Sequence, residues 1–324
     1  MAAGNTNFTK LITTTLQNLP SEVFDALSTN NALYYKLEKK GNLKIVNGGR
    51  SFTHPIFYKS NTSFKSYGKT DTIDTPLMDD LTRAEYPIKI VAGSVVVSIL
   101  EEAMNAGNKE KLIDLVEETA LRAKVSMSEI MGDQTFSDGS AANDIDGLQF
   151  LINTSPSTQT DVGGINPSTT GNDYWRNQVD TTGTAAFNTL IAGLTLMNTM
   201  LNNCTFGRQG PKLIVTTKAV YALYEIGQTS NIRYIADNEL ADAGFRNLAY
   251  STIPIVFDDN CPTGRMYFID TDQLWLQVLS RGNMELTDMQ QSLDQLLRVA
   301  ILYLFGNLTT GSRRTNGLLT AITG

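Results

Sequence analysis

Histidine and cysteine, which build most metal centres and many catalytic sites, are nearly missing from this sequence. The 324 residues include two cysteines and one histidine. Two cysteines, Cys204 and Cys261, are too few for a disulfide framework or a thiolate metal site, so we expect two buried free thiols. A single histidine makes a Ser-His-Asp triad hard to assemble, and no G-x-S-x-G elbow is present. We therefore expect His54 to be a packing or solvated residue of a strand.

The sequence also lacks the motifs that bind phosphates, dinucleotides or zinc. There is no G-x-x-x-x-G-K-[ST], no G-x-G-x-x-G, no H-E-x-x-H and no C-x-x-C. Residues 207–212 resemble a phosphate loop, but Pro211 removes an amide donor and no Ser or Thr follows Lys212. We therefore predict no cofactor and no enzymatic activity, although a carboxylate site of unrecognised pattern stays open.

Acidic residues gather at two turns. Asp138, Asp144 and Asp146 lie in residues 137–147, but their spacing differs from that of a helix–loop–helix calcium site. Asp258 and Asp259 are adjacent, so their side chains point apart. We interpret both segments as turns stabilised by side-chain to backbone hydrogen bonds, and we predict no metal site.

Long apolar runs are absent. No run approaches the roughly 18 apolar residues of a membrane span, and the N-terminus has no apolar signal-peptide region. A hydrophobic content of 41% with 18% charged residues is typical of a folded protein with a real core. We therefore expect folding in the reducing cytoplasm and no membrane association.

The net charge of −7 argues against a nucleic-acid binder that neutralises phosphates, because such a protein needs a basic face. A shell that encloses DNA without reading its sequence needs no such face. The one small basic cluster comprises Lys36, Lys39, Lys40 and Lys44. It is either a solvated surface or a contact with enclosed DNA or an acidic neighbour.

Two β-favouring runs, residues 51–58 and 84–98, predict an extended hairpin. The segment between them is rich in Ser, Thr, Asn, Asp, Lys and Gly. An isolated two-stranded hairpin is marginally stable in water, so we expect this one to lie on a second copy of the protein. Phe64 and Tyr67 are aromatic residues of the polar tip, and we expect them to contact that neighbour.

The rest of the chain alternates helices and strands. Residues 1–43 read as a short helical arm, and residues 109–131 as an amphipathic helix about 35 Å long. Between residues 140 and 270 the pattern predicts a mixed α/β region. Its expected helices are 184–202 and 218–226, and its expected strands are 212–217, 253–257, 266–270 and 274–278. From residue 293 to 305 both alternating faces are apolar, which predicts a strand that is buried on both sides, except at its start, and that pairs with strands flanking the long helix.

A long, nearly uncharged loop covers residues 153–183. Loops of this length are functional or disordered in most proteins. It contains Tyr174, Trp175 and Arg176, residue types enriched at interface hot spots. These three residues either contact a neighbouring subunit or pin the loop to its own domain.

The order of these elements resembles the major capsid proteins of tailed double-stranded DNA phages, whose fold also occurs in encapsulins and in the herpesvirus capsid floor. The local patterns at residues 211–225, 253–278 and 297–324 are similar to segments of that family. The resemblance implies an α+β fold with four parts. They are an N-terminal arm (1–44), an extended loop (45–95), a peripheral domain with a long spine helix (96–135 and 279–324) and an axial α/β domain (136–278).

The resemblance further implies hexamers and pentamers that close into an icosahedral or prolate phage head around double-stranded DNA. The protein would be a virion component assembled in the host cytoplasm, with a portal and, in some phages, a decoration protein. Many relatives begin with a coiled-coil segment that scaffolds assembly, and this sequence leaves no room for one before residue 45. We therefore expect a separate scaffolding protein.

Some relatives crosslink a loop lysine to an asparagine of a neighbour. Lys59, Lys65 and Lys69 lie in the corresponding region, but no local motif carries that chemistry over. The residues expected at the assembly interface are Phe64, Lys65, Tyr67, Lys69, Tyr174, Trp175 and Arg176. The alternatives are an encapsulin-type shell around a protein cargo and, from another class, an α/β enzyme or a sugar-binding module.

Overall fold

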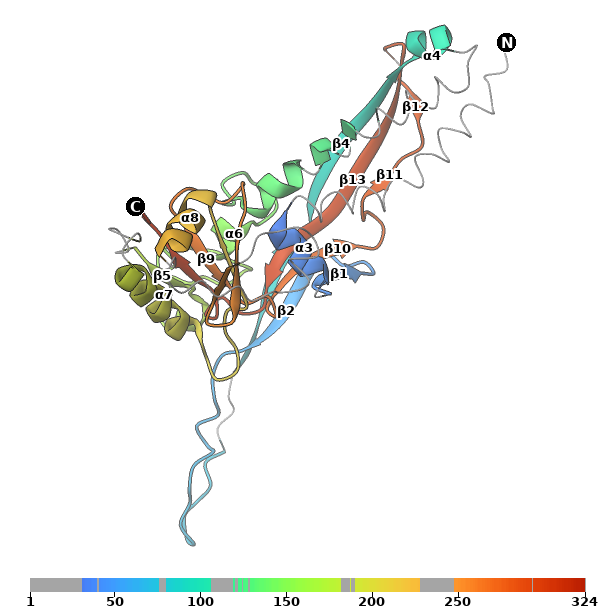
Figure 1. Ribbon diagram of the computed structural model, residues 1–324. Coiled ribbons are helices and arrows are strands. Elements are labelled where there is room, and N and C mark those ends of the chain that lie inside the picture. The colour runs from blue at the N-terminus through green and yellow to red at the C-terminus, as the bar shows by residue number, and fades with distance from the viewer. Residues whose placement is uncertain are drawn as a thin grey trace.

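A computed structural model of the chain shows an elongated molecule. It describes residues 31–39, 41–75, 80–105, 119, 122–123, 125–127, 129–181, 187, 190–227, 248–292 and 294–323. Two slender β-structures project from a central body in opposite directions (Figure 1). One is an arm built on β4 (Lys89–Ser98) and β13 (Leu297–Thr310), and the other is the hairpin of β2 (Ser51–Phe57) and β3 (Leu81–Pro87).

The first sheet continues from the body into the arm. Its remaining strands are β1 (Leu43–Val46), β10 (Leu274–Leu279), β11 (Glu285–Leu286) and β12 (Gln290–Gln291). β13 pairs with β4 in the arm, from Leu297 opposite Ser98 to Gly306 opposite Lys89, and then with β10 in the body. Gly306 lies where the two pairings meet. A Cβ atom there would be 2.8 Å from the Gln277 carbonyl oxygen, so this close approach requires glycine.

The second sheet has the strand order β5-β14-β9-β6-β8-β7. These strands are β5 (Gln178–Asp180), β6 (Leu213–Thr216), β7 (Leu248–Tyr250), β8 (Ile253–Phe257), β9 (Met266–Ile269) and β14 (Gly317–Leu319). Both of its faces are covered. Ile214, Ile255 and Phe268 lie in one core with residues of α7 (Leu190–Cys204) and α8 (Lys218–Gly227).

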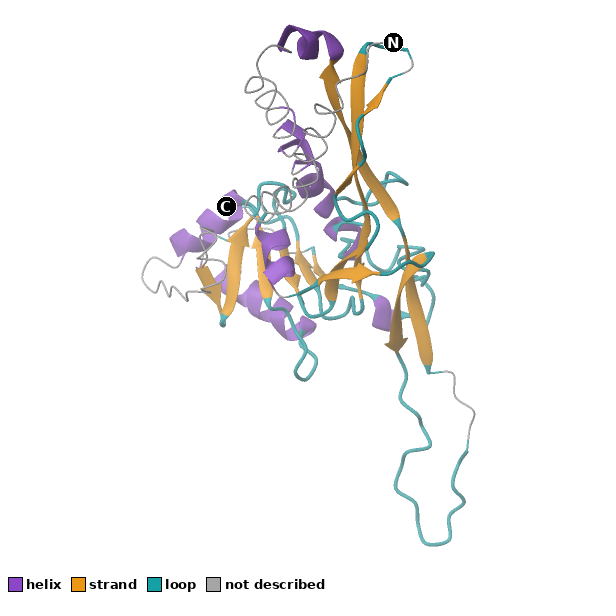
Figure 2. Cartoon of the chain, turned by 90° about the vertical axis from the view of Figure 1, so that its right-hand side faces the viewer, coloured by secondary structure: helices purple, strands orange, loops and turns teal. Residues whose placement is uncertain are grey.

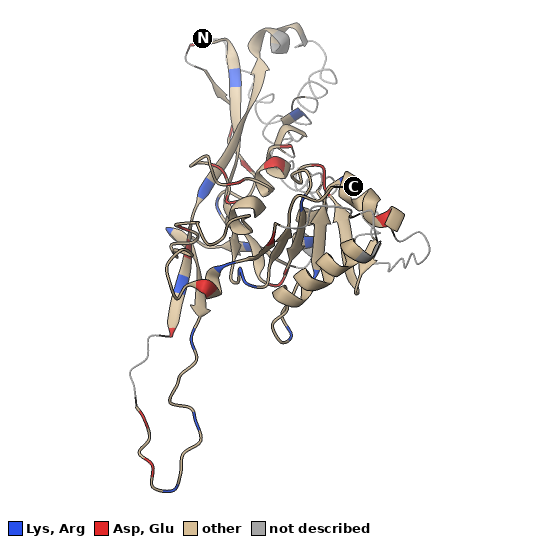
Figure 3. Cartoon of the chain, turned by 90° about the vertical axis from the view of Figure 1, so that its left-hand side faces the viewer, with Lys and Arg blue, Asp and Glu red and all other residues tan. Residues whose placement is uncertain are grey.

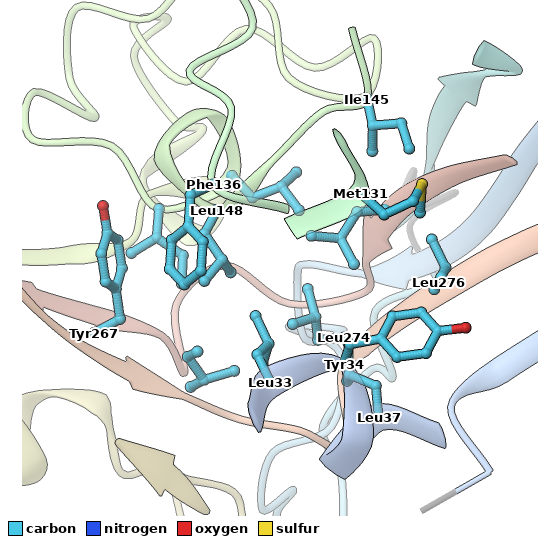
Figure 4. Packing of buried hydrophobic residues seen from close by; sticks show 14 of the residues in the cluster. Leu33, Tyr34, Leu37, Met131, Phe136, Ile145, Leu148, Tyr267, Leu274 and Leu276 are labelled. Carbon is cyan, nitrogen blue, oxygen red and sulfur yellow. The ribbon is translucent and has the colours of Figure 1, made fainter. Parts of the chain in front are cut away.

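The opposite face belongs to the larger core, which joins the two sheets. α3 (Ala32–Lys39) contributes Leu33 and Leu37, and α6 (Leu148–Leu151) contributes Leu148. Figure 4 shows these side chains gathered with Tyr267 of β9 and Leu274 of β10. The helix α4 (Ile99–Asn105) lies at the far end of the arm, and Asp173–Trp175 form the 3-10 turn η1. Figure 2 shows the arm and the hairpin as the two ends of the long axis.

Several element predictions are confirmed. β2, β6, α8, β8 and β9 lie where the sequence pattern places them. Cys204 and Cys261 are buried free thiols. The tail strand pairs with β4, the strand before the long helix, as expected. Of residues 109–131, those that the structure describes are helical. The others, and residues 1–30 of the predicted helical arm, lie outside the described residues.

Two predictions about strands are wrong. Residues 84–98 do not form one strand, because the chain leaves β3 at Pro87 and enters β4 at Lys89 with a different partner. β13 is not buried on both faces in the arm: Ala300, Leu302 and Leu304 are buried, whereas Ile301 is 46% exposed. Alternation alone could not reveal that the described residues of the subunit leave the second face exposed.

Two further strands join a different sheet from the one that the sequence suggested. β10 was expected in the α/β region, but it pairs with β1 and β13 of the first sheet. β14 was expected with the peripheral elements, but it pairs with β5 and β9 of the second sheet. The chain therefore passes from one sheet to the other between β9 and β10 and returns after β13. The domain boundaries themselves remain a proposal.

Candidate assembly interface

The hairpin has a base that is anchored to the body. β2 and β3 form a two-stranded sheet without a third strand. One face of this ribbon is buried, with Phe52 2% and Tyr86 0% exposed. The Tyr86 hydroxyl donates to the Thr310 carbonyl oxygen over 3.1 Å, and the Glu85 amide donates to the Gly163 carbonyl oxygen over 2.8 Å. The base therefore obtains from its own subunit the support that an isolated hairpin lacks.

His54 is part of this anchor and is buried, so of the two expected environments it has the packed one. Its ring stacks on Trp275 with centroids 4.7 Å apart. Its Nε2 lies 3.0 Å from Thr309 Oγ1 and 3.1 Å from Gln277 Nε2. Burial, together with the charge of Lys44, lowers the pKa of His54 from 6.5 to about 4. The imidazole is therefore neutral at physiological pH and acts as a packing and hydrogen-bonding group.

The tip of the hairpin, residues 59–75, has no contact of this kind with the body. It is organised by its own side chains. The Tyr67 hydroxyl donates to the Ser63 carbonyl oxygen and accepts from the Asp74 amide, and Lys65 forms an ion pair with Asp74 at 2.6 Å. Phe64 is 87% exposed. An aromatic side chain on a small, internally bonded loop is a feature of a docking element.

The charges of the tip are mixed. Figure 3 shows basic residues along one side of the projecting loop and acidic residues along the other. Lys69 and Asp71 are exposed, and the Asp71 carboxylate accepts from the Gly68 amide. A docking surface with balanced charges has little long-range attraction of one sign, so specificity there would come from shape and from Phe64.

Tyr174, Trp175 and Arg176 were expected either to contact a neighbouring subunit or to pin the loop to its own domain, and the structure shows their contacts within the subunit. Trp175 is 1% exposed, and its indole N–H donates to the Val162 carbonyl oxygen over 2.8 Å, so its own subunit buries it. Arg176 Nε donates to the Pro167 carbonyl oxygen over 2.7 Å. Tyr174 stacks on Tyr58 at the end of the hairpin base, with centroids 4.9 Å apart. The described contacts pin the loop, and a role of Tyr174 and Arg176 at a subunit interface remains a prediction.

The sequence reasoning missed one surface. The outward face of the arm carries exposed apolar side chains, with Ile90 63%, Val96 39% and Ile301 46% exposed. On the same face, Tyr303 and Phe305 have ring centroids 4.8 Å apart. An apolar strip on a thin arm is typical of a surface that another protein covers. The signal was present in the two apolar faces of residues 293–305, but it was interpreted as burial within the subunit.

The acidic turns behave as turns. The Ser140 amide donates to Asp138, the Asn260 amide donates to Asp258, and Asp146 accepts from Asn307. Burial raises the pKa of Asp258 to about 6, and Asp259 forms an ion pair with Lys218. Among the residues that the structure describes, no group of three or more His, Cys, Asp or Glu could hold a metal ion.

The phosphate-loop resemblance also has a structural explanation. Phe206 and Gln209 form an isolated β-bridge that closes a tight turn, and Lys212 forms an ion pair with Asp272.

Within the described part of the chain, no helix is long and apolar enough to span a membrane.

Comparison with known proteins gives structural matches only. No protein-family model matches the sequence, and no curated protein matches it. The capsid of cyanophage A-1(L) is similar to the structure with a TM-score of 0.65 and 16% identity, over 88% of this chain and 92% of that chain. The capsid of Myoviridae phage XM1 has a TM-score of 0.56 and 10% identity, over 88% and 92%.

A cellular shell protein is also similar. A chain of the holo-SrpI encapsulin complex from Synechococcus elongatus PCC 7942 has a TM-score of 0.53 and 10% identity, over 86% of this chain and 85% of that chain. At these identities the likeness shows the fold. The chain has the α+β fold of the tailed-phage major capsid proteins, as its sequence pattern predicted.

Proposed function

We propose that this protein is the major capsid protein of a tailed phage. Copies would form hexamers and pentamers that close into an icosahedral or prolate head around double-stranded DNA. The observation that carries the proposal is the match of almost the whole chain, 88%, to almost the whole of a cyanophage capsid chain, 92%. A fold hosts many functions in general, so a capsid role also requires surfaces suited to assembly.

Two surfaces of the protomer support assembly. One is the tip, which lies far from the body and exposes Phe64. The other is the apolar outward face of the arm. A monomeric protein seldom exposes such features on thin projections, because they promote association. In a closed shell both become buried contacts, and many weak contacts per copy are enough for a stable particle.

The same features support a structural role in preference to catalysis. The neighbours in structure are shell proteins, and the titratable groups with large pKa shifts, such as His54 and Asp258, are buried in packing or turn environments. They do not converge on a common cavity in the described residues. An enzyme or a sugar-binding module is therefore the weaker alternative.

Under this proposal the parts of the chain have distinct tasks. The extended loop reaches a neighbouring subunit, the peripheral domain provides the arm and long helix, and the axial domain meets its copies on the five- and sixfold axes. Scaffolding would come from a separate protein, and a portal would admit DNA. The shell would contact DNA without reading its sequence, which suits a chain of net charge −7.

Electron microscopy of the expressed full chain, alone and together with the products of neighbouring genes, tests this function. Closed particles are the expected result. A protein that remains monomeric or dimeric at micromolar concentration, with and without a scaffold, would contradict it. The encapsulin-type alternative is favoured by the match to the holo-SrpI complex, and particle contents distinguish the two. Packaged DNA with a portal indicates a phage head, and a protein cargo without a portal indicates a cellular compartment.

A further inference from the structure

The direction in which the hairpin leaves the body is set by a small number of contacts, and several of them come from one loop. Residues 153–177, named the bracket here, contain the 3-10 turn η1 as their only helix and no strand. The bracket contacts both strands of the hairpin. Gly163 meets β3 through the hydrogen bond from the Glu85 amide, and Tyr174 stacks on Tyr58 just beyond β2.

The contact at Gly163 is unusually close. Gly163 has a φ angle of +63°, and a Cβ atom there would lie 3.0 Å from the Tyr86 ring and 3.2 Å from Ala84. Only glycine allows both the left-handed backbone and this approach. The bracket therefore places its backbone directly against the buried face of the hairpin, next to β3.

Arg313 holds the bracket in place. Its side chain is 0% exposed. Its guanidinium donates to the carbonyl oxygens of Leu151 over 2.8 Å and Trp175 over 3.0 Å. It also donates to the side-chain oxygens of Gln159 and Asn177. Three of these acceptors lie within the bracket, and the fourth, on Leu151, lies just before it. The planar guanidinium therefore joins both ends and the middle of the bracket to the chain just before β14.

These hydrogen-bond acceptors are neutral oxygens, and among the described residues no carboxylate forms an ion pair with the guanidinium. Burying a cation without a carboxylate has a large desolvation cost, which four well-directed hydrogen bonds offset only in part. An apolar side chain of similar size would fill the same volume without that cost. Such an apolar side chain could not, however, hold four acceptors from separate segments of the loop in one plane.

We propose that the bracket is a device that fixes the direction of the hairpin in the free protomer, with Arg313 as its positioning residue. The tip then reaches a neighbour from a preset angle, which lowers the entropy lost when subunits associate. The benefit for assembly rests on the function proposed above. The orientation of the hairpin does not, and it can be measured on the single protein.

The test measures a distance between two spin labels, one on the hairpin and one on the body, by pulsed electron spin resonance. Leu81 at the start of β3 is 61% exposed, and Asn198 is exposed on α7, so Leu81→Cys and Asn198→Cys supply the sites. The native thiols are buried and remain unlabelled. Labelled copies are diluted into unlabelled copies, so that only distances within one chain contribute.

The parent protein should give one narrow distance distribution. Arg313→Met should widen it at least twofold, Arg313→Lys should keep part of the narrow component, and Tyr174→Ala should widen it less. Val220→Ala, on the buried face of α8, is the matched control: it should lower the melting temperature and leave the distribution narrow.

A distribution that stays narrow in Arg313→Met, while the melting temperature falls, would overturn the proposal and leave Arg313 with a purely structural role. If Arg313→Met does not fold, Tyr174→Ala decides, because its half-buried ring touches the hairpin without holding the bracket. An unchanged distribution in Tyr174→Ala would then contradict the proposal. Failure to form particles, with these distances as expected, would contradict only the proposed function.

Discussion

The two ends of the same hairpin differ in what holds them. At the base, Phe52 and Tyr86 are buried, and the strands bond to the body through Gly163, Thr309 and Thr310. At the tip, Phe64 is 87% exposed and the hydrogen bonds remain within the loop. The sequence suggested that the whole hairpin depends on a neighbour for its stability. In the structure the base is supported by its own subunit, so we now predict that dependence for the tip alone.

This difference separates folding from assembly. Changes at the base should reduce the stability of the protomer, because they remove buried contacts. Changes at the tip should leave the protomer folded and reduce association, because they remove a surface that only a neighbour covers. A variant that breaks this division would show that the base and the tip are not independent.

The largest effect on stability is expected for Trp175→Ala, which removes the buried indole of the bracket that supports the hairpin base. Loss of a fully buried aromatic side chain and of its hydrogen bond to Val162 should lower the free energy of unfolding by about 3–5 kcal/mol. Urea unfolding measures this. Phe64→Ala, at the tip, is the comparison and should change the free energy by less than about 0.5 kcal/mol. Similar losses in the free energy of unfolding in both variants would show that the base and the tip do not differ in this way.

Deletion of residues 62–69 should have the largest effect on assembly. The protomer keeps its base contacts, so its melting temperature should stay within a few degrees of the parent value. Particle yield should fall about tenfold or more, because a loss of roughly 1.4 kcal/mol at each contact lowers the association constant of that contact tenfold. Sedimentation separates particles from free subunits. Unchanged particle yield would mean that the tip is not an assembly element.

His54→Gln tests the anchor of the base through pH. Burial holds the pKa of His54 at about 4, below its usual 6.5, so the folded state disfavours the protonated ring. The stabilisation by neutral His54 is present above pH 6.5 and is lost as the pH falls through 4. The melting temperature of the parent protein should therefore fall more between pH 7 and pH 4.5 than that of the variant. Parallel pH profiles would show that His54 does not contribute in this way.

The smallest effect is expected for Tyr67→Phe. This change removes only the hydroxyl that joins Ser63 and Asp74 within the tip. Global stability should not change measurably, because the tip has no buried core. Assembly should become slower by a few-fold, since the neighbour must now order a looser loop. A change in melting temperature of several degrees would show that the tip is coupled to the body.

Sequence patterns were sufficient for the local elements. The alternating run of β2 and the strand–turn–helix of β6 and α8 have short-range causes, namely β-branched residues and an apolar stripe. The order of these elements was also enough to indicate the capsid fold. Patterns of this kind depend only on neighbours in the chain, which is why they could be read without coordinates.

Sheet membership and the support of the hairpin depend on residues far apart in the chain. β10 and β14 have ordinary strand sequences, and nothing local shows which sheet each joins. Arg313 gave no signal at all, because its four partners come from residues 151–177. The pairing of His54 with Trp275 likewise joins segments that only the folded chain brings together. Of the expected interface residues, the structure buries Trp175 and leaves Phe64 exposed.

Hydrogen–deuterium exchange, measured on the free protomer and on assembled particles, tests the distinction between base and tip most directly. Amides of β2 and β3 should be protected in both states, since their own subunit anchors them. Amides of residues 59–75 should exchange rapidly in the protomer and become protected in the particle. Protection of the tip in the free protomer, or rapid exchange of the tip in a closed particle, would contradict the account.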